Sequence, residues 1–278
     1  PSPTNVGAVQ LIAYTAQEQY STDLYTINTD GSDRRCLCTS LTDERGPVWS
    51  PDSKYVAFIA GMPNGKARCK LLVSDLSGTI PRQLAENVDC VAPSWTPDGM
   101  YLTYADMRSS EQSGIFVVSI ESGTARKILE PVAIVTSLSW SPDGEHLAYT
   151  LEGGDLYITQ RSAGDAKVLV EVATQPTSGL SWSSDGRWLL VAAQDGQVDL
   201  LAIDASGNTS SIQLTHSPAI EVIGQAAWSP DGGQVAYLVN NEVRIAPLDG
   251  GATLELTHDG VIKGTPAWLM DGEEVIYN

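Results

Sequence analysis

Basic residues are scarce in this 278-residue chain. It holds 16 Lys and Arg against 34 Asp and Glu, which gives a net charge of −18. Residues 1–82 contain eight acids and eight bases, so the whole acidic excess belongs to the later part of the chain. Nucleic-acid binding relies on Lys and Arg at the phosphates, and we therefore expect no nucleic-acid partner. The negative electrostatic field of the acidic part attracts a cation or a cationic protein surface. Acids on a surface also serve solubility alone.

Signals of catalysis and of membrane insertion are missing as well. The chain has no Gly-x-Ser-x-Gly nucleophile turn and no Gly-rich phosphate loop. The three histidines, His146, His216 and His258, are scattered over different repeats and form neither a triad nor a metal set. No apolar run is long enough to span a membrane. We therefore expect no catalytic residue, no metal and no cofactor.

The chain does contain a repeated phrase of the type Trp-Ser-Pro-Asp-Gly. Its tryptophans recur every 40 to 46 residues, at Trp49, Trp95, Trp140, Trp182, Trp228 and Trp268. A fixed period in this range is typical of a repeat architecture. The Pro, Asp and Gly of the phrase favour a tight turn, so its acids are expected to serve turn chemistry. These acids are Asp52, Asp98, Asp143, Asp185, Asp231 and Asp271.

Each repeat predicts four short strands separated by turns. In the repeat that begins at Trp140 they cover residues 138–140, 146–151, 155–160 and 167–170. Second strands such as 56–60 are apolar almost throughout, which indicates that both of their faces are covered. Sheets that stack face to face around an axis form a β-propeller. We predict an all-β fold, a six-bladed β-propeller of four-stranded antiparallel blades.

The two ends of the chain are predicted to close the ring by strand pairing. The chain opens with a second, a third and a fourth strand and closes with a first strand at 266–268. One ambiguity remains, because 9–14 and 274–278 both resemble second strands and compete for one place. Residues 1–8 are interpreted as a tail or linker and 9–278 as a single propeller domain. The start without Met is consistent with a trimmed, mature chain or with an arbitrary boundary.

The repeated phrase resembles the repeat of TolB-like propellers, also called the WD40-like or PD40 repeat. In that family a small residue or Pro precedes Trp-Ser-Pro-Asp-Gly and an apolar strand follows. The resemblance covers nearly the whole chain, from about Gln10 to Asn278. It departs from true WD40 repeats, which carry Gly-His and Trp-Asp dipeptides. Ser184 replaces the Pro of one phrase, and Leu269 and Met270 replace Ser-Pro in the last.

The resemblance implies several functions, because one fold serves many. Some relatives are periplasmic or extracellular binding scaffolds, some are gating domains of prolyl-oligopeptidase-type peptidases, and a few are polysaccharide lyases. We favour a non-catalytic scaffold that binds a protein or peptide at its channel rim, in the periplasm or outside the cell. A propeller enzyme or enzyme fragment is the alternative, and a small-molecule or glycan ligand stays open.

The four cysteines all lie in the first third of the chain, at positions 36, 38, 69 and 90. In a propeller, Cys38, Cys69 and Cys90 map to one rim of the ring. A disulfide between Cys69 and Cys90 is one hypothesis, and unpaired buried thiols are the other. A disulfide fits an oxidising compartment. A zinc site is disfavoured, because Cys-x-Cys lacks the spacing of a zinc knuckle.

Polar residues that precede the first strands are expected at the mouth of the channel. Such a mixed set is able to bind a peptide or a sugar, but it offers no matched acid and base. An ordinary solvated rim is the simpler interpretation of the same residues. The candidates for binding are Asp43, Glu44, Arg45, Asp89, Ser178 and Lys263.

Overall fold

The computed structural model is described in segments. They cover residues 11–17, 21–37, 42–61, 68–76, 80–106, 113–160, 166–171, 179–194, 198–206, 211–215, 223–261, 263, 266–269 and 271–277. Two compact units divide the chain, unit 1 over residues 1–130 and unit 2 over residues 131–278. The predicted single domain over residues 9–278 stays a prediction.

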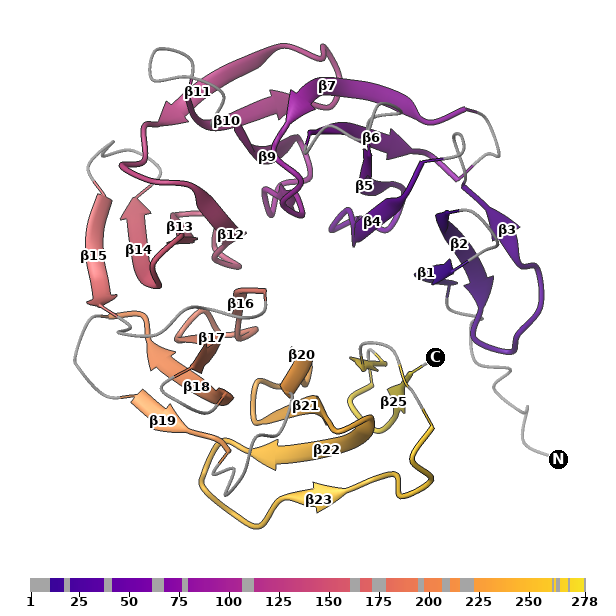
Figure 1. The fold of residues 1–278 in the computed structure, drawn as a ribbon, viewed down its shortest axis with the longest axis vertical. Helices are drawn as coiled ribbons and strands as arrows, with labels where there is room; N and C mark the ends of the chain where they lie inside the picture. The colour runs from indigo at the N-terminus through magenta and orange to yellow at the C-terminus, as the bar shows by residue number, and fades with distance from the viewer. Residues whose placement is uncertain are drawn as a thin grey trace, which may run out of the picture. The chain divides into compact units, whose positions relative to one another are not determined.

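All regular structure in the described segments is β-strand, as predicted. Every pair of neighbouring strands is antiparallel, and each sheet follows the order of its strands along the chain (Figure 1). The described residues hold no helix with the length and hydrophobicity of a membrane span.

Unit 1 contains three sheets, one of three strands and two of four, in the orders β1-β2-β3, β4-β5-β6-β7 and β8-β9-β10-β11. The two four-stranded sheets share a core in which Leu71, Trp95 and Leu102 are buried. The strands are β1 (Leu11–Gln17), β2 (Thr22–Asn28), β3 (Arg35–Cys36), β4 (Glu44–Trp49), β5 (Val56–Gly61), β6 (Cys69–Ser74), β7 (Arg82–Val88), β8 (Ser94–Trp95), β9 (Tyr101–Asp106), β10 (Gly114–Ser119) and β11 (Ala125–Leu129).

Unit 2 contains three four-stranded sheets and one two-stranded sheet. Trp188, Leu200 and Val235 belong to the core shared by the second and third of these sheets. The strands are β12 (Val135–Trp140), β13 (His146–Leu151), β14 (Asp155–Gln160), β15 (Ala166–Glu171), β16 (Ser181–Trp182), β17 (Trp188–Gln194), β18 (Val198–Asp204), β19 (Ser211–Gln213), β20 (Ile223–Trp228), β21 (Gln234–Val239), β22 (Glu242–Pro247), β23 (Leu254–Glu255), β24 (Ala267–Trp268) and β25 (Val275–Ile276).

Both segments that compete for the closing place form strands. Leu11–Gln17 pairs with β2 along its whole length, and Val275–Ile276 pairs with β24. Each of the two segments thus has a pairing partner within its own unit. The predicted pairing of the C-terminal first strand with the N-terminal strands would join the two units, and it stays a prediction.

Five of the six repeated phrases contain the same hydrogen-bonded turn. Ser141 Oγ donates to Asp143 Oδ1 and accepts from the amide of His146 at 2.9 Å. Asp143 Oδ1 also accepts from the amide of Glu145 at 2.9 Å, and Gly144 has a φ of 72°, which favours glycine. The same side-chain pair occurs at Ser50 and Asp52, Thr96 and Asp98, Ser183 and Asp185, and Ser229 and Asp231.

The indole N–H of a phrase tryptophan ties its sheet to the preceding one. Trp95 Nε1 donates to the carbonyl of Val48 at 3.1 Å, and Trp182 Nε1 donates to that of Ser139 at 3.0 Å. In each case the acceptor stands directly before the tryptophan of the preceding phrase. Trp228 and Trp268 repeat this bond, to the carbonyls of Ser181 and Ala227. At these four positions the ring therefore packs and donates at once, which explains why tryptophan recurs there.

The turn carboxylates make the fold sensitive to acid. Hydrogen bonds from Lys54 and Ser50 lower the pKa of Asp52 to about 2, and bonds from Ser141 and the Glu145 amide lower the pKa of Asp143. A carboxyl whose folded pKa lies below its unfolded value, about 3.9, stabilises the fold above that pH. This stability is lost as the pH falls through the folded pKa.

Replacing one turn carboxylate should destabilise the protein at neutral pH and not in acid. We expect Asp143→Ala to lower the free energy of unfolding at pH 7 by about 1 kcal/mol, because two hydrogen bonds are lost. The difference from wild type should shrink below about pH 4, measured by denaturant unfolding. Glu145→Ala is the control for loss of a neighbouring exposed carboxylate. A pH-independent difference for Asp143→Ala would contradict this explanation.

Candidate binding rim

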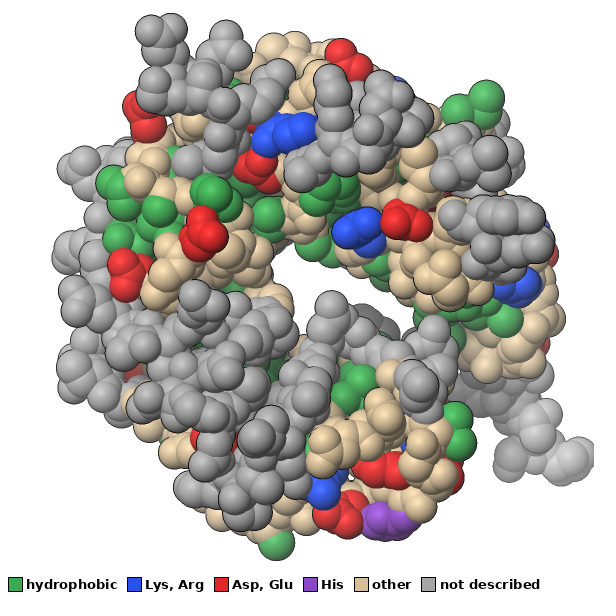
Figure 2. All heavy atoms as spheres, viewed as in Figure 1, with side chains coloured by type: hydrophobic (Ala, Val, Ile, Leu, Met, Phe, Trp, Pro, Cys, Tyr) green, Lys and Arg blue, Asp and Glu red, His purple; other side chains and the backbone are tan. Residues whose placement is uncertain are grey.

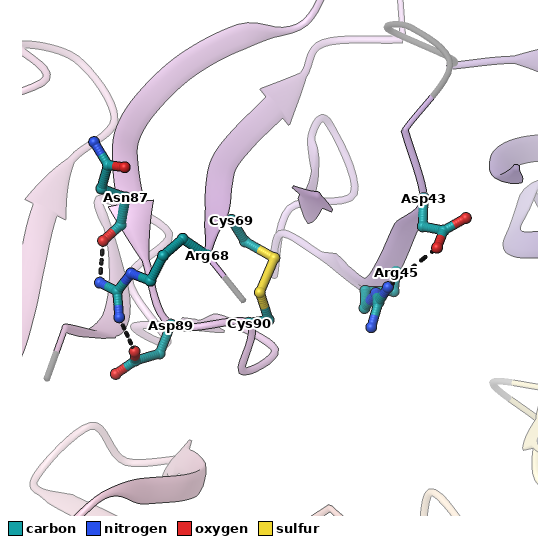
Figure 3. The surroundings of a disulfide bond; sticks show 7 residues. All are labelled: Asp43, Arg45, Arg68, Cys69, Asn87, Asp89 and Cys90. Atoms are coloured by element: carbon teal, nitrogen blue, oxygen red, sulfur yellow. Dashed lines mark hydrogen bonds and ion pairs between the residues drawn. A yellow bond between two sulfur atoms is a disulfide. The ribbon is translucent and has the colours of Figure 1, made fainter. Parts of the chain in front are cut away.

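Two predicted rim residues, Asp43 and Arg45, flank the start of β4 in unit 1. Their side chains are 50% and 54% exposed, and Arg45 Nη2 lies 3.4 Å from Asp43 Oδ2 (Figure 3). Asp43 Oδ1 also accepts a hydrogen bond from the amide of Thr22 at 2.9 Å. An exposed ion pair of this kind is worth little to stability. Its charged groups are therefore free to exchange their mutual contact for a ligand at small cost.

Glu44 lies between these two residues but points to the interior. Successive side chains of a strand alternate between its faces, so the neighbour of two exposed side chains turns inward. Glu44 is fully buried, and its Oε2 accepts from the amide of Leu24 in β2 at 3.0 Å. Its carboxylate joins two sheets of unit 1, and we leave it out of the proposed site.

Asp89, the fourth candidate, belongs to a cluster around Arg68 (Figure 3). The guanidinium of Arg68 donates to Asp89 and to the backbone carbonyl of Asn87, and it lies 2.7 Å from Asp106 Oδ1. All three charged side chains are largely buried. The cluster connects the ends of β6 and β7 with β9. Sequence reasoning missed Arg68 and Asp106, because no local pattern distinguishes them.

A disulfide joins Cys69, at the start of β6, to Cys90, just after β7 (Figure 3). Its Cα atoms are 5.2 Å apart, and the two residues are 21 apart in sequence. Closing a loop of this size stabilises a fold by about 3 kcal/mol in the chain-entropy account. Cys36 is disulfide-bonded as well. The Cys69–Cys90 disulfide and the Arg68 cluster both lie around the start of β6 and the end of β7.

Lys263, predicted at the rim of unit 2, is buried, with only 3% of its side chain exposed. Its ammonium group contacts Asp259 and Glu242 and donates to the carbonyls of Asn241 and Val261, each at 3.0 Å. Burial lowers the pKa of Lys263, but the bonds to Asp259 and Glu242 outweigh it and the pKa is raised. Lys263 therefore fastens the segment before β24, and we leave it out of the proposed site.

The last candidate, Ser178, lies outside the described residues. Within the described part of the chain, no three His, Cys, Asp or Glu side chains come together as a metal site would require. Of the candidate residues that the structure describes, Asp43 and Arg45 are thus the two that are exposed and in contact with each other. A carboxylate and a guanidinium side by side suit hydrogen bonds to the backbone or the charged side chains of a peptide.

Residues 8–169 match the TolB beta propeller domain, which is more than half of the chain. The chain belongs to this family. Residues 171–200 match the WD domain, G-beta repeat, and residues 197–277 match the dipeptidyl peptidase IV N-terminal region. The predicted family is confirmed, and so is the predicted class, a six-bladed β-propeller.

The TolB-like propeller is also similar to parts of longer proteins. It is 26% identical over 210 residues to the uncharacterized peptidase YuxL of Bacillus subtilis, covering 73% of this chain and 30% of that protein. It is 34% identical over 90 residues to the Tol-Pal system protein TolB of Legionella pneumophila, covering 32% of this chain and 20% of that one. The chain thus spans a third or less of these relatives.

Solved structures show the same fold at low identity. TolB from Acinetobacter baumannii has a TM-score of 0.65 at 21% identity, covering 90% of this chain and 64% of that one. A prolyl endopeptidase has a TM-score of 0.69 at 18% identity, covering 96% and 44%. An oligogalacturonate lyase from Vibrio parahaemolyticus has 0.70 at 12%, covering 95% and 82%. TolB, an endopeptidase and a lyase therefore share this fold.

Removing the buried ammonium group should loosen the segment before β24. We expect Lys263→Met to lower the melting temperature clearly and to speed amide exchange at Gly260 and Val261, because Asp259 and Glu242 lose their shared cation. Lys54→Met, which breaks an exposed pair with Asp52, is the matched control. Equal effects of the two variants in differential scanning calorimetry would contradict a structural role for Lys263.

Proposed function

We propose that this TolB-like propeller is a non-catalytic scaffold that binds a protein or peptide at its channel rim. The observation that carries the proposal is the half-exposed pair of Asp43 and Arg45 at the start of β4. The disulfide and Arg68 support it, because they lie in the same sheet as β4, at the end of the sheet where Asp43 is found. Preorganised polar groups bind with little loss of conformational entropy.

The charge of the chain favours a partner with a cationic surface. Residues 131–278 carry 19 acidic and five basic side chains, so most of the excess belongs to unit 2. Opposite charges speed association and help to select the partner. If a glycan or a small molecule binds at the same rim, it should compete with a bound peptide and lower the peptide's apparent affinity.

We also propose that the protein acts in the periplasm or outside the cell. The disulfide between Cys69 and Cys90 supports this location, because such bonds persist in oxidising compartments and are rare in the cytosol.

A library of short synthetic peptides tests the proposed function. We expect some of the peptides to bind and to be recovered intact, as measured by fluorescence anisotropy and mass spectrometry. Arg45→Gln should weaken the best of them about tenfold, the loss of one charge-assisted bond. Arg35→Gln is the matched control, because Arg35 pairs with Asp33 with similar exposure. No bound peptide, or equal effects of the two variants, would refute the proposal.

A second candidate is the propeller part of a peptidase. It is supported by the match to YuxL over 210 residues and by the match of residues 197–277 to the dipeptidyl peptidase IV N-terminal region. In that case the rim would admit peptides to a catalytic domain elsewhere in the protein. Hydrolysis of library peptides by the full-length gene product would favour this candidate.

A further inference from the structure

Unit 2 exposes apolar side chains in the segment 131–134, which leads into β12. Val132 is 86% exposed and Ile134 is 50% exposed. Val132 is the most exposed large hydrophobic side chain in the described part of unit 2. Single exposed aliphatic residues are common on protein surfaces, but two in one short segment mark a candidate contact.

The position of Ile134 in its sheet matches that of Asp43 in unit 1. The carbonyl of Asp43 accepts from the amide of Gly61 at 2.8 Å, just before the first pair of β4 and β5. The carbonyl of Ile134 accepts from the amide of Glu152 at 2.7 Å, just before the first pair of β12 and β13. Ile134 therefore stands directly before β12, at the position that Asp43 occupies directly before β4.

Two acidic residues follow β13, the strand that pairs with β12. Glu152 is exposed and its amide donates to the carbonyl of Ile134, and Asp155, which is half-buried, begins β14. Gly153 and Gly154 have φ values of 110° and 102°, so the turn depends on two glycines in a conformation that other residues rarely adopt. Figure 2 shows hydrophobic and acidic side chains together over β12–β14. We define Val132, Ile134, Glu152 and Asp155 as the apolar-acidic patch.

We propose that the apolar-acidic patch binds a basic amphipathic segment of a partner protein. The partner's aliphatic or aromatic side chain would cover Val132 and Ile134, and its lysines or arginines would contact Glu152 and Asp155. This occupant follows from charge complementarity, because Glu152 adjoins Ile134 through the backbone and unit 2 carries 19 acids against five bases. The inference rests on the proposed function, and it names the chemistry of the partner.

A fluorescein-labelled peptide of alternating lysine and leucine is the probe. We expect it to bind the intact protein more tightly than two matched peptides, one with serine in place of leucine and one with glutamate in place of lysine. The combined change Val132→Ser and Ile134→Ser should weaken binding about tenfold. Glu152→Gln should weaken it about threefold and reduce the salt dependence.

Matched controls separate the patch from general surface effects. Ile80→Ser removes a 90% exposed aliphatic side chain of unit 1, and Glu145→Gln removes an exposed acid of unit 2. Both should bind the probe as wild type does, and circular dichroism melting should show all variants folded. Equal binding of the lysine-leucine and lysine-serine peptides would overturn the proposal, as would wild-type binding by the doubly substituted protein. If library peptides bind through Arg45 while the lysine-leucine peptide does not bind, the patch fails and the proposed function stands.

Discussion

The hydrogen bond from a phrase tryptophan to the preceding sheet is the interaction on which the rest of the structure depends. It joins side chains of one repeat to the backbone of another at fixed geometry, with N···O distances of 3.0–3.3 Å at Trp95, Trp182, Trp228 and Trp268. Hydrophobic packing alone is non-directional and permits sheets to slide. A directed bond at the same place in successive repeats fixes the register of neighbouring sheets, and so fixes where each sheet presents its rim.

A regular scaffold of this kind leaves the rim free to vary. The turns and indole bonds recur in several repeats, whereas the segments before the first strands differ in chemistry. One presents Asp43 and Arg45, and another presents Val132 and Ile134 at the corresponding edge of its sheet. Such a division between constant frame and variable edge allows one fold to serve binding proteins and enzymes alike.

Periodic features could be predicted from the sequence, and singular ones could not. The repeat predicts the strands and the turns because every copy carries the same pattern. The Cys69–Cys90 bond is one of two hypotheses that the sequence leaves open, and the structure contains it. The bounds of individual strands still differ from the prediction. The first strand expected over residues 138–140 begins earlier, at Val135, whose side chain is buried. The inward turn of Glu44 and the burial of Lys263 depend on partners far away in sequence. The repeated pattern carries no signal of such contacts. The exposure of each candidate rim residue therefore could not be predicted from the sequence.

The most direct test of the indole bond compares two tryptophans of equal burial. Trp95 and Trp188 are both 7% exposed, but only Trp95 belongs to the repeated phrase, where it donates to Val48 of the preceding sheet. The free energy of unfolding should fall by about 1 kcal/mol more for Trp95→Phe than for Trp188→Phe, since the first also loses a bond between sheets. Equal losses for the two variants would contradict the account, because packing alone would then explain the repeat.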